Sequence, residues 1–294
     1  MRQIFIDGML GIGDNIMERP FIKELAKTHQ VWLKTATPEI FCDISNVYFV
    51  RSNTPLRTQH KNEKTSSIAF SSLAPEGIPS KRIFYGNAEL QLPGGIFESA
   101  KKQFGVKPHE LDLPIFDMPD IPELQDKKIA IIRPTTERRE WHNAARGPLN
   151  IHIDQASRTL KERGYFCVSV ADVDGVNEWI TGDEPYADLK LHRGELRLTE
   201  LFSLIQNATV VITGAGVVSQ AALAYRTPMI FLGGGCGGSN HHSRITCNEI
   251  MDLSRCAFIY PDNYCMCQMM QHNCDKRISN LTEKITEWLN VQNI

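Results

Sequence analysis

Short apolar runs that alternate with helical patterns constrain the fold of this chain more than any other feature of its sequence. Apolar runs bounded by glycine, proline and polar residues predict strands at 3–6, 31–33, 47–50, 129–132, 166–171, 209–213 and 228–232. Apolar residues at helical spacing predict helices at 15–28, 92–106, 151–163, 198–205, 217–226 and 277–289. Strands that alternate with helices form parallel sheets covered by those helices. The sequence therefore predicts an α/β fold.

A proline-rich stretch divides this pattern into two series. Pro108, Pro114, Pro119 and Pro122 follow one another closely, and proline discourages regular structure because it lacks a backbone donor. We therefore predict a linker over 107–127 and two domains, at 1–122 and 123–294. A length of 294 residues suits two domains of about 150 residues each. Two such halves are expected to face each other across a ligand cleft.

The overall charge and hydropathy exclude some classes of protein. The formal net charge is −2, so bulk electrostatics do not indicate a nucleic-acid binder. No apolar run approaches the length of about 18 residues that a membrane span needs. The first residues predict a strand and not a secretion signal, so we expect a cytoplasmic location.

The segment from Gly8 to Pro20 combines a glycine-rich loop with an acidic residue. Glycine tolerates positive φ and lets backbone amides approach a ligand, and the following helix N-terminus favours negative charge. Asp14, where this loop ends, is our candidate general base for an acceptor hydroxyl. Gly11, Gly13 and Asn15 would complete an acceptor-side loop. The alternative is that Asp14 caps its helix, since Asp is a favoured N-cap residue.

The loop 133–149, which follows the strand 129–132, carries the candidate ligands of a diphosphate. Arg138 and Arg139 offer guanidinium groups that match phosphate oxygens bidentately and keep their charge. Thr135 and Thr136 add hydroxyl and backbone donors. The alternative is a solvated basic loop.

Two later loops add candidate donor-binding residues. Gly214, Ala215 and Gly216 precede a helix that contains Ser219, so backbone amides there could meet a phosphate, although close packing of helix and strand explains small residues equally well. Asp172 follows the strand 166–171, where an acid can hold a ribose hydroxyl or serve only in a turn.

The cysteines are concentrated near the C-terminus. The chain has eight, and six lie at or beyond position 236. Cys256, Cys265, Cys267 and Cys274, with His272 nearby, are candidate ligands of a structural zinc or iron ion, because thiolates bind these metals tetrahedrally. The alternative is that they are reduced thiols buried in packing.

Four segments together resemble the glycosyltransferases of family nine, the heptosyltransferase-like enzymes with the GT-B fold. The matching segments are Gly11–Asp14 with Pro20, Arg133–Trp141, Leu198–Ala208, and Val210–Val217 with Ala221–Ala224 and Thr227–Pro228. The resemblance implies two Rossmann-like domains, with 1–122 on the acceptor side and 123–294 binding a nucleotide sugar. It also implies inverting sugar transfer that requires no catalytic cofactor, and some relatives carry a cysteine-bound iron in this part of the chain.

The resemblance leaves the partners open. An ADP-, GDP- or UDP-linked donor is expected, with a saccharide as acceptor or, for a phage-type enzyme, a modified DNA base. Gly214 or Ala215 stands where the family usually has an acid, and Ser219-Gln220 where it has a histidine. These departures favour one alternative, a nucleotide-sugar-binding module without activity. A nucleotide-sugar epimerase on the same fold is a further alternative.

Overall fold

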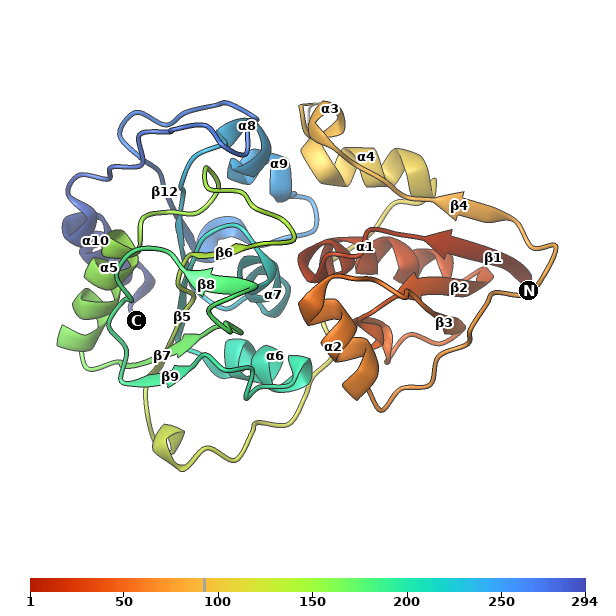
Figure 1. Cartoon of the computed structure of the whole chain (residues 1–294), viewed down its shortest axis with the longest axis horizontal. Helices are drawn as coiled ribbons and strands as arrows, with labels where there is room; N and C mark the ends of the chain where they lie inside the picture. The colour runs from red at the N-terminus through yellow and green to blue at the C-terminus, as the bar shows by residue number, and fades with distance from the viewer. Residues whose placement is uncertain (92–93) are drawn as a thin grey trace. The chain divides into compact units, whose positions relative to one another are not determined.

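The computed structural model describes residues 1–91 and 94–294, and these form two compact units (Figure 1). Unit 1 comprises Met1–Ile115 and Ser243–Met251, and unit 2 comprises Phe116–His242 and Asp252–Ile294. The chain passes from unit 1 to unit 2 inside the proline-rich stretch. It later returns to unit 1 for the segment Ser243–Met251, which the sequence pattern did not indicate.

Unit 1 is built on a four-stranded parallel sheet in the order β3-β2-β1-β4. Its strands are β1 (Arg2–Asp7), β2 (His29–Thr35), β3 (Val47–Arg51) and β4 (Ser80–Arg82). Its helical segments are α1 (Ile12–Leu25), η1 (Pro38–Phe41), α2 (Arg57–Thr65), α3 (Asn87–Leu90), α4 (Gly95–Phe104) and most of α9 (His242–Ile245). Parallel pairing requires a crossover between strands, and α1 provides it between β1 and β2.

Unit 2 contains a six-stranded parallel sheet in the order β12-β11-β10-β5-β7-β9. Its strands are β5 (Ile129–Ile132), β7 (Phe166–Val170), β9 (Leu189–Leu191), β10 (Val210–Thr213), β11 (Met229–Leu232) and β12 (Cys256–Ile259). A separate antiparallel pair joins β6 (Thr136–Arg138) to β8 (Glu178–Ile180). The helical segments are η2 (Pro122–Leu124), α5 (Asn150–Glu162), α6 (Leu198–Asn207), α7 (Val217–Tyr225), α8 (Gly237–Asn240), η3 (Leu253–Arg255) and α10 (Leu281–Gln292).

The core of unit 2 lies between this sheet and its helices. Helices α5 and α10 lie side by side (Figure 1), and their apolar faces pack into one buried cluster with β5, β10 and β11. Ile153 and Leu160 come from α5, and Ile285 and Leu289 from α10; all four are fully buried. Each such side chain stabilises the fold by about 1.5–3 kcal/mol, so periodic apolar faces decide where these helices dock.

All seven predicted strands are confirmed, as β1, β2, β3, β5, β7, β10 and β11. Helix α2 was missed, because its inward face is polar: Gln59 and Glu63 are buried there, and Glu63 Oε1 accepts the backbone N–H of Ser52 at 2.7 Å. The helix predicted over 92–106 is α4, and its first two predicted positions lie outside the described residues. Helix α1 begins three residues earlier than predicted, at Ile12 and not at 15, with Pro20 in its interior.

No helix within the described residues combines the length and the apolar character that crossing a bilayer requires.

Arg19 is a fully buried cation at the centre of unit 1. Its guanidinium donates to both carboxylate oxygens of Asp43 at 2.7 and 2.8 Å, and to Asp112 at 3.1 Å. A further bond reaches the carbonyl of Ile40 at 2.6 Å. Burial alone would raise the pKa of Asp112, but the bonds from Arg19 and Lys23 outweigh it and hold that pKa below its ordinary value. Arg19 thus fastens α1 to two connecting segments.

We expect Arg19→Ala to destabilise unit 1 by about 3–5 kcal/mol, because it empties the space of a fully buried side chain and removes the guanidinium that Asp43 and Asp112 share. Lys23→Ala is the matched control: Lys23 contacts the same Asp112 at 2.6 Å, but its side chain is 37% exposed, and its loss should cost less than about 1 kcal/mol. Urea titration with hydrogen-exchange mass spectrometry of unit 1 peptides measures both. Equal losses would contradict this account of Arg19.

Candidate functional site

The loops that follow β5 and β10 meet at the carboxyl edge of the unit 2 sheet. These two strands pair directly, although they are far apart in the chain, and β7 lies on the other side of β5. The order of the sheet therefore reverses between β5 and β10. Open α/β sheets bind ligands at such a switch point, outside the carboxyl ends of the strands.

A buried carboxylate organises the loop after β5. Glu178 is 2% exposed; its Oε1 accepts from Arg133 at 3.1 Å and from the Thr136 hydroxyl at 2.7 Å, and its Oε2 lies 3.1 Å from Nε of Arg138. Arg133 also donates to the carbonyl of Val170 at 3.0 Å. Burial would raise the pKa of Glu178, but the two arginines outweigh it and lower that pKa. One carboxylate thus holds two guanidinium groups, which suits the site to an anion.

The predicted donor-binding residues of this loop differ in what they contact. Arg138 lies on β6 and is held by Glu178, whereas Arg139 is exposed and donates its backbone N–H to Asn177 at 2.8 Å. The Thr135 hydroxyl donates to the carbonyl of Pro148 at 2.8 Å, so it shapes the loop itself. Glu178 orients Arg138 and Thr136. The sequence analysis missed it because Glu178 lies forty residues after Arg138 in the chain, on the separate short strand β8.

The loop after β10 leads into the N-terminus of α7, with Gly216 at the N-cap. A Cβ on Gly214 would lie 2.8 Å from the ring of Pro148, so this glycine is required by close packing. Apart from residues adjacent in the chain, no atom of the described structure lies within 4 Å of a Cβ built on Gly216, which leaves room beside that backbone. Ser219 is 1% exposed; its hydroxyl accepts the Gly216 N–H at 3.1 Å and donates to the Gly216 carbonyl at 2.8 Å. Ser219 therefore caps α7, with Gly214, Ala215 and Gly216 half-buried in front of it.

The two acids after β7 have different roles. Asp174 accepts the backbone N–H groups of Val176 at 2.9 Å and Asn177 at 2.7 Å, and bonds of this kind hold the pKa of Asp174 far below its ordinary value. Asp174 thus closes a turn. Asp172, the predicted donor ligand, is half-buried and forms a β-bridge with Arg193.

In unit 1, Asp14 lies at the carboxyl edge of the parallel sheet. Helix α1 has Gly11 as its N-cap, so Asp14 is in the first turn and does not occupy the cap position. Its carboxylate is half-buried, and Oδ1 accepts the hydroxyl of Tyr85 at 2.7 Å. Tyr85 follows β4, the strand beside β1. No sequence signal pointed to Tyr85, because only the pairing of β4 with β1 brings it near Asp14.

The glycines of the first loop matter because they lack a Cβ atom, and not because of unusual backbone angles. Gly8, Gly11 and Gly13 all lie within the described range 1–91, and none has a positive φ, so the tolerance of glycine for positive φ is not used here. A Cβ on Gly8 would overlap Glu18 Oε2, and a Cβ on Gly11 would overlap Asp14 Oδ2. Glycine is therefore needed so that two carboxyl groups can lie against the loop.

Asn15 holds this loop through side-chain hydrogen bonds. It is 1% exposed, and its side-chain amide donates to the carbonyls of Met9 at 2.8 Å and Gly11 at 2.9 Å. Its amide oxygen accepts the Thr35 hydroxyl at 2.7 Å. These bonds give Asn15 a structural role in the predicted acceptor-side loop.

Glu18 lies under the same loop. It is 1% exposed, and its Oε1 accepts the backbone N–H of Met9 at 3.0 Å. Burial raises the pKa of Glu18 well above its ordinary value, and the nearby charges of Asp14 and Asp7 add to the rise. Glu18 is therefore a buried acid that favours its protonated form.

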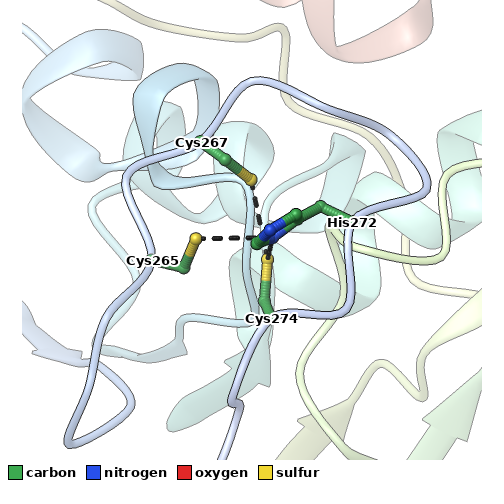
Figure 2. Close-up of side chains that lie close together, drawn as sticks. All are labelled: Cys265, Cys267, His272 and Cys274. Carbon is green, nitrogen blue, oxygen red and sulfur yellow. Dashed lines mark hydrogen bonds between the residues drawn. The ribbon is translucent and has the colours of Figure 1, made fainter.

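A second candidate centre in unit 2 gathers three thiols and an imidazole (Figure 2). The ligand atoms of Cys265, Cys267, His272 and Cys274 all lie within 4.8 Å of one another. His272 Nδ1 is 3.5 Å from Cys265 Sγ and 3.3 Å from Cys274 Sγ. Cys256, the fourth predicted cysteine, lies on β12 outside this group, and His272 stands in its place.

The spacing of this group fits a tetrahedral metal. Two thiolates bound tetrahedrally at about 2.3 Å to one ion would lie about 3.8 Å apart, and Cys267 Sγ is 3.6 Å from Cys274 Sγ. Three sulfur ligands and one nitrogen suit zinc or iron, and a bound ion would keep the thiols deprotonated. We refer to these four residues as the Cys–His cluster.

The Cys–His cluster lies against two loops of the unit 2 sheet edge. Backbone N–H groups of Gly237 and Gly238, at the start of α8, donate to the carbonyls of Cys265 at 2.8 Å and Cys267 at 3.0 Å. A Cβ on Gly235 would overlap Cys274 Sγ. Because Gly235 N–H also donates to Ala145 at 2.8 Å, the cluster braces the loop that follows β6 as well.

Known structures share this fold, although no protein-family model matches the chain and no curated protein sequence does. The iron-containing dodecameric glycosyltransferase TibC from enterotoxigenic E. coli matches with a TM-score of 0.64 at 14% identity, over 99% of this chain and 76% of TibC. TibC is also known in complex with ADP-D-β-D-heptose. The E. coli ADP-heptose lipopolysaccharide heptosyltransferase II matches with a TM-score of 0.58 at 12% identity, over 100% of both chains.

A family 9 glycosyltransferase from Veillonella parvula matches with a TM-score of 0.58 at 11% identity, over 99% of this chain and 96% of that one. These likenesses extend over nearly the whole chain. They confirm the predicted α/β fold of the heptosyltransferase type, with parallel sheets in both units.

We expect Glu18→Gln to change how stability depends on pH. A raised pKa in the folded state means that the contribution of Glu18 is complete below the ordinary carboxyl pKa, 4.5, and is lost as pH rises toward the folded-state value. Over that window the native protein should lose about 1.4 kcal/mol per pH unit relative to the variant. Urea unfolding at a series of pH values measures this slope, with pH 4 as the internal control. A difference that does not vary with pH would contradict a protonated Glu18.

We expect the Cys–His cluster to bind one tetrahedral metal ion per chain. Cobalt(II) added to the apoprotein should give thiolate charge-transfer absorption, and Cys274→Ser should abolish it. Cys256→Ser is the matched control and should leave both the spectrum and the metal content unchanged, because Cys256 lies outside the cluster. A spectrum that depends on Cys256 would overturn this ligand set.

Proposed function

We propose that this protein is an inverting glycosyltransferase that moves a sugar from a nucleotide-sugar donor to an acceptor hydroxyl. Unit 2 binds the donor and unit 1 binds the acceptor, in keeping with the domains predicted over 123–294 and 1–122. The segment Ser243–Met251 counts with unit 1. The fold shared with heptosyltransferases supports sugar transfer in general.

The observation that carries the proposal is the anion site at the switch point of unit 2. The loop with Arg133, Thr136 and Arg138 and the N-terminus of α7 follow two neighbouring strands. Guanidinium groups match phosphate oxygens, and the positive end of a helix dipole adds to their attraction. A nucleoside diphosphate is the leaving group that needs such neutralisation. Arg139 and Thr135 belong to the same loop, and Asp172 is the candidate ligand of the ribose.

The reaction then proceeds as a single displacement. The acceptor oxygen attacks the anomeric carbon of the donor sugar while its proton passes to the Asp14 carboxylate. The bond between that carbon and the phosphate oxygen breaks, and its electron pair leaves with the nucleoside diphosphate. One displacement inverts the configuration of the anomeric carbon. Asp14 acts as a general base, a role that contributes about 10²–10⁴-fold to rate.

An ADP-linked heptose is the first donor to test, because TibC is known in complex with ADP-D-β-D-heptose. GDP- and UDP-sugars are the next donors, and a saccharide is the acceptor class that the relatives suggest.

Catalysis as proposed uses arginine side chains and a helix N-terminus to neutralise the diphosphate. Zinc or iron in the Cys–His cluster would hold loops in place and would take no part in the reaction. A reducing, cytoplasmic setting would keep these thiols able to bind metal.

A nucleotide-sugar-binding module without activity is the second candidate function. It is favoured by the small residues Gly214 and Ala215 and by the buried, capping Ser219, since the side chains that the resembled family places there are absent from this sequence. The two candidates differ in turnover and not in binding.

A thermal-shift screen with ADP-, GDP-, UDP- and CMP-sugars identifies the donor, since a bound ligand stabilises the folded protein by an amount that grows with the logarithm of its concentration over Kd. Release of the nucleoside diphosphate from the selected donor, with a panel of saccharide acceptors, then measures transfer. Binding without release across the panel would favour the module.

We expect Asp14→Asn to lower kcat about 10²-fold or more while the thermal shift caused by the donor stays the same, because the amide cannot take the proton. Arg138→Gln is the complementary variant and should weaken donor binding instead. Full turnover by Asp14→Asn would remove Asp14 from the proposed mechanism.

A further inference from the structure

We propose that Tyr85 is a positioning residue for Asp14, whose carboxylate it holds in one orientation and in its charged form through a hydrogen bond to Oδ1. This inference rests on the proposed function, in which Asp14 is the base. It is drawn from residues of unit 1 alone.

The parallel pairing of β1 with β4 brings the two side chains together. Asp7, at the end of β1, pairs with Arg82 at the end of β4, and the N–H of Ile83 donates to the Asp7 carbonyl at 3.0 Å. The backbone from Ile83 to Tyr85 therefore continues beside the loop that leads from β1 into α1. Tyr85 is 6% exposed, so the packed ring fixes where its hydroxyl can point.

The direction of the bond follows from chemistry. A carboxylate offers only acceptors, so the Tyr85 hydroxyl must donate to Asp14. Burial raises the pKa of Tyr85 well above its ordinary value, with the charges of Asp14 and Glu18 adding to the rise. The phenol therefore keeps its proton at neutral pH. A donor that faces the charged form favours that form.

Two other acidic residues lie near the loop that carries Asp14. Asp7 is negatively charged and is paired with Lys34 at 3.1 Å. Glu18 is buried under the same loop, and its burial favours the neutral acid. A neutral Glu18 adds no charge that would discourage ionisation of Asp14, and the hydroxyl of Tyr85 favours it as a donor to Oδ1. The bond also fixes the plane of the carboxylate, with Oδ2 on the side of Gly11.

The test compares Tyr85→Phe with the native protein by two readouts. The first is the pH titration of the Asp14 carboxyl carbon by NMR of protein labelled with ¹³C at aspartate Cγ, with Asp14→Asn to assign the signal. We expect the midpoint in Tyr85→Phe to rise by about 0.5–1 pH unit, because a donor to the charged form is lost. The second is turnover of ADP-heptose, in which kcat should fall about tenfold with KM unchanged and the acid limb of the pH profile should move up with the NMR midpoint.

Tyr165→Phe is the matched control. Tyr165 is 1% exposed in unit 2, and its hydroxyl has no hydrogen-bond partner in the described structure, so its loss should move neither readout. Should Tyr85→Phe fail to fold, 3-fluorotyrosine incorporated at position 85 keeps the ring and supplies a more acidic donor. The Asp14 midpoint should then move down.

The outcomes separate this inference from the proposed function. A midpoint that stays the same in Tyr85→Phe overturns the inference, whether or not Asp14 proves essential for transfer. A shifted midpoint with unchanged kcat and pH profile in an active enzyme also overturns it. A shifted midpoint in a protein that transfers no sugar supports the hold of Tyr85 on Asp14 and defeats the proposed function.

Discussion

Parallel strand pairing is the constraint on which the rest of this structure depends. Both main sheets are entirely parallel, so each strand is followed by a loop at the carboxyl edge and by a crossover that returns the chain. All loops that follow strands within a sheet are thereby collected on one side. In unit 1 this collects Asp14 and Tyr85, and in unit 2 it collects the arginine loop and the N-terminus of α7. In both units, the residues brought together are far apart in the sequence.

Buried charged groups then hold these loops in shape. Arg19 fastens α1 to the segments that carry Asp43 and Asp112, and Glu178 fastens the loop after β5 through Arg133 and Arg138. Each group has several hydrogen-bonding partners, which offset the cost of removing its charge from water. The loops can therefore stay polar and accessible at their tips while their bases are fixed. This combination suits a site that must recognise an anion without rearranging.

The candidate site was only partly predictable from the sequence. The position of Asp14 after the first strand follows from the apolar run and the glycines, and Thr135, Thr136 and Arg138 follow from their place after the strand at 129–132. Three of the four predicted cysteines do come together, but His272 and not Cys256 completes the group. The helix α2 was missed because its buried residues are polar, so the segment shows no apolar periodicity.

The sequence by itself determined the α/β class and seven of the strands, because apolar periodicity acts locally. Tertiary structure alone decided that Tyr85 donates to Asp14, that burial raises the pKa of Glu18 and that Glu178 joins two arginines. These contacts depend on which strands become neighbours and on how deeply each group is buried. Both are properties of the packed molecule, since partners distant in the chain create the low-dielectric surroundings that set each proton affinity.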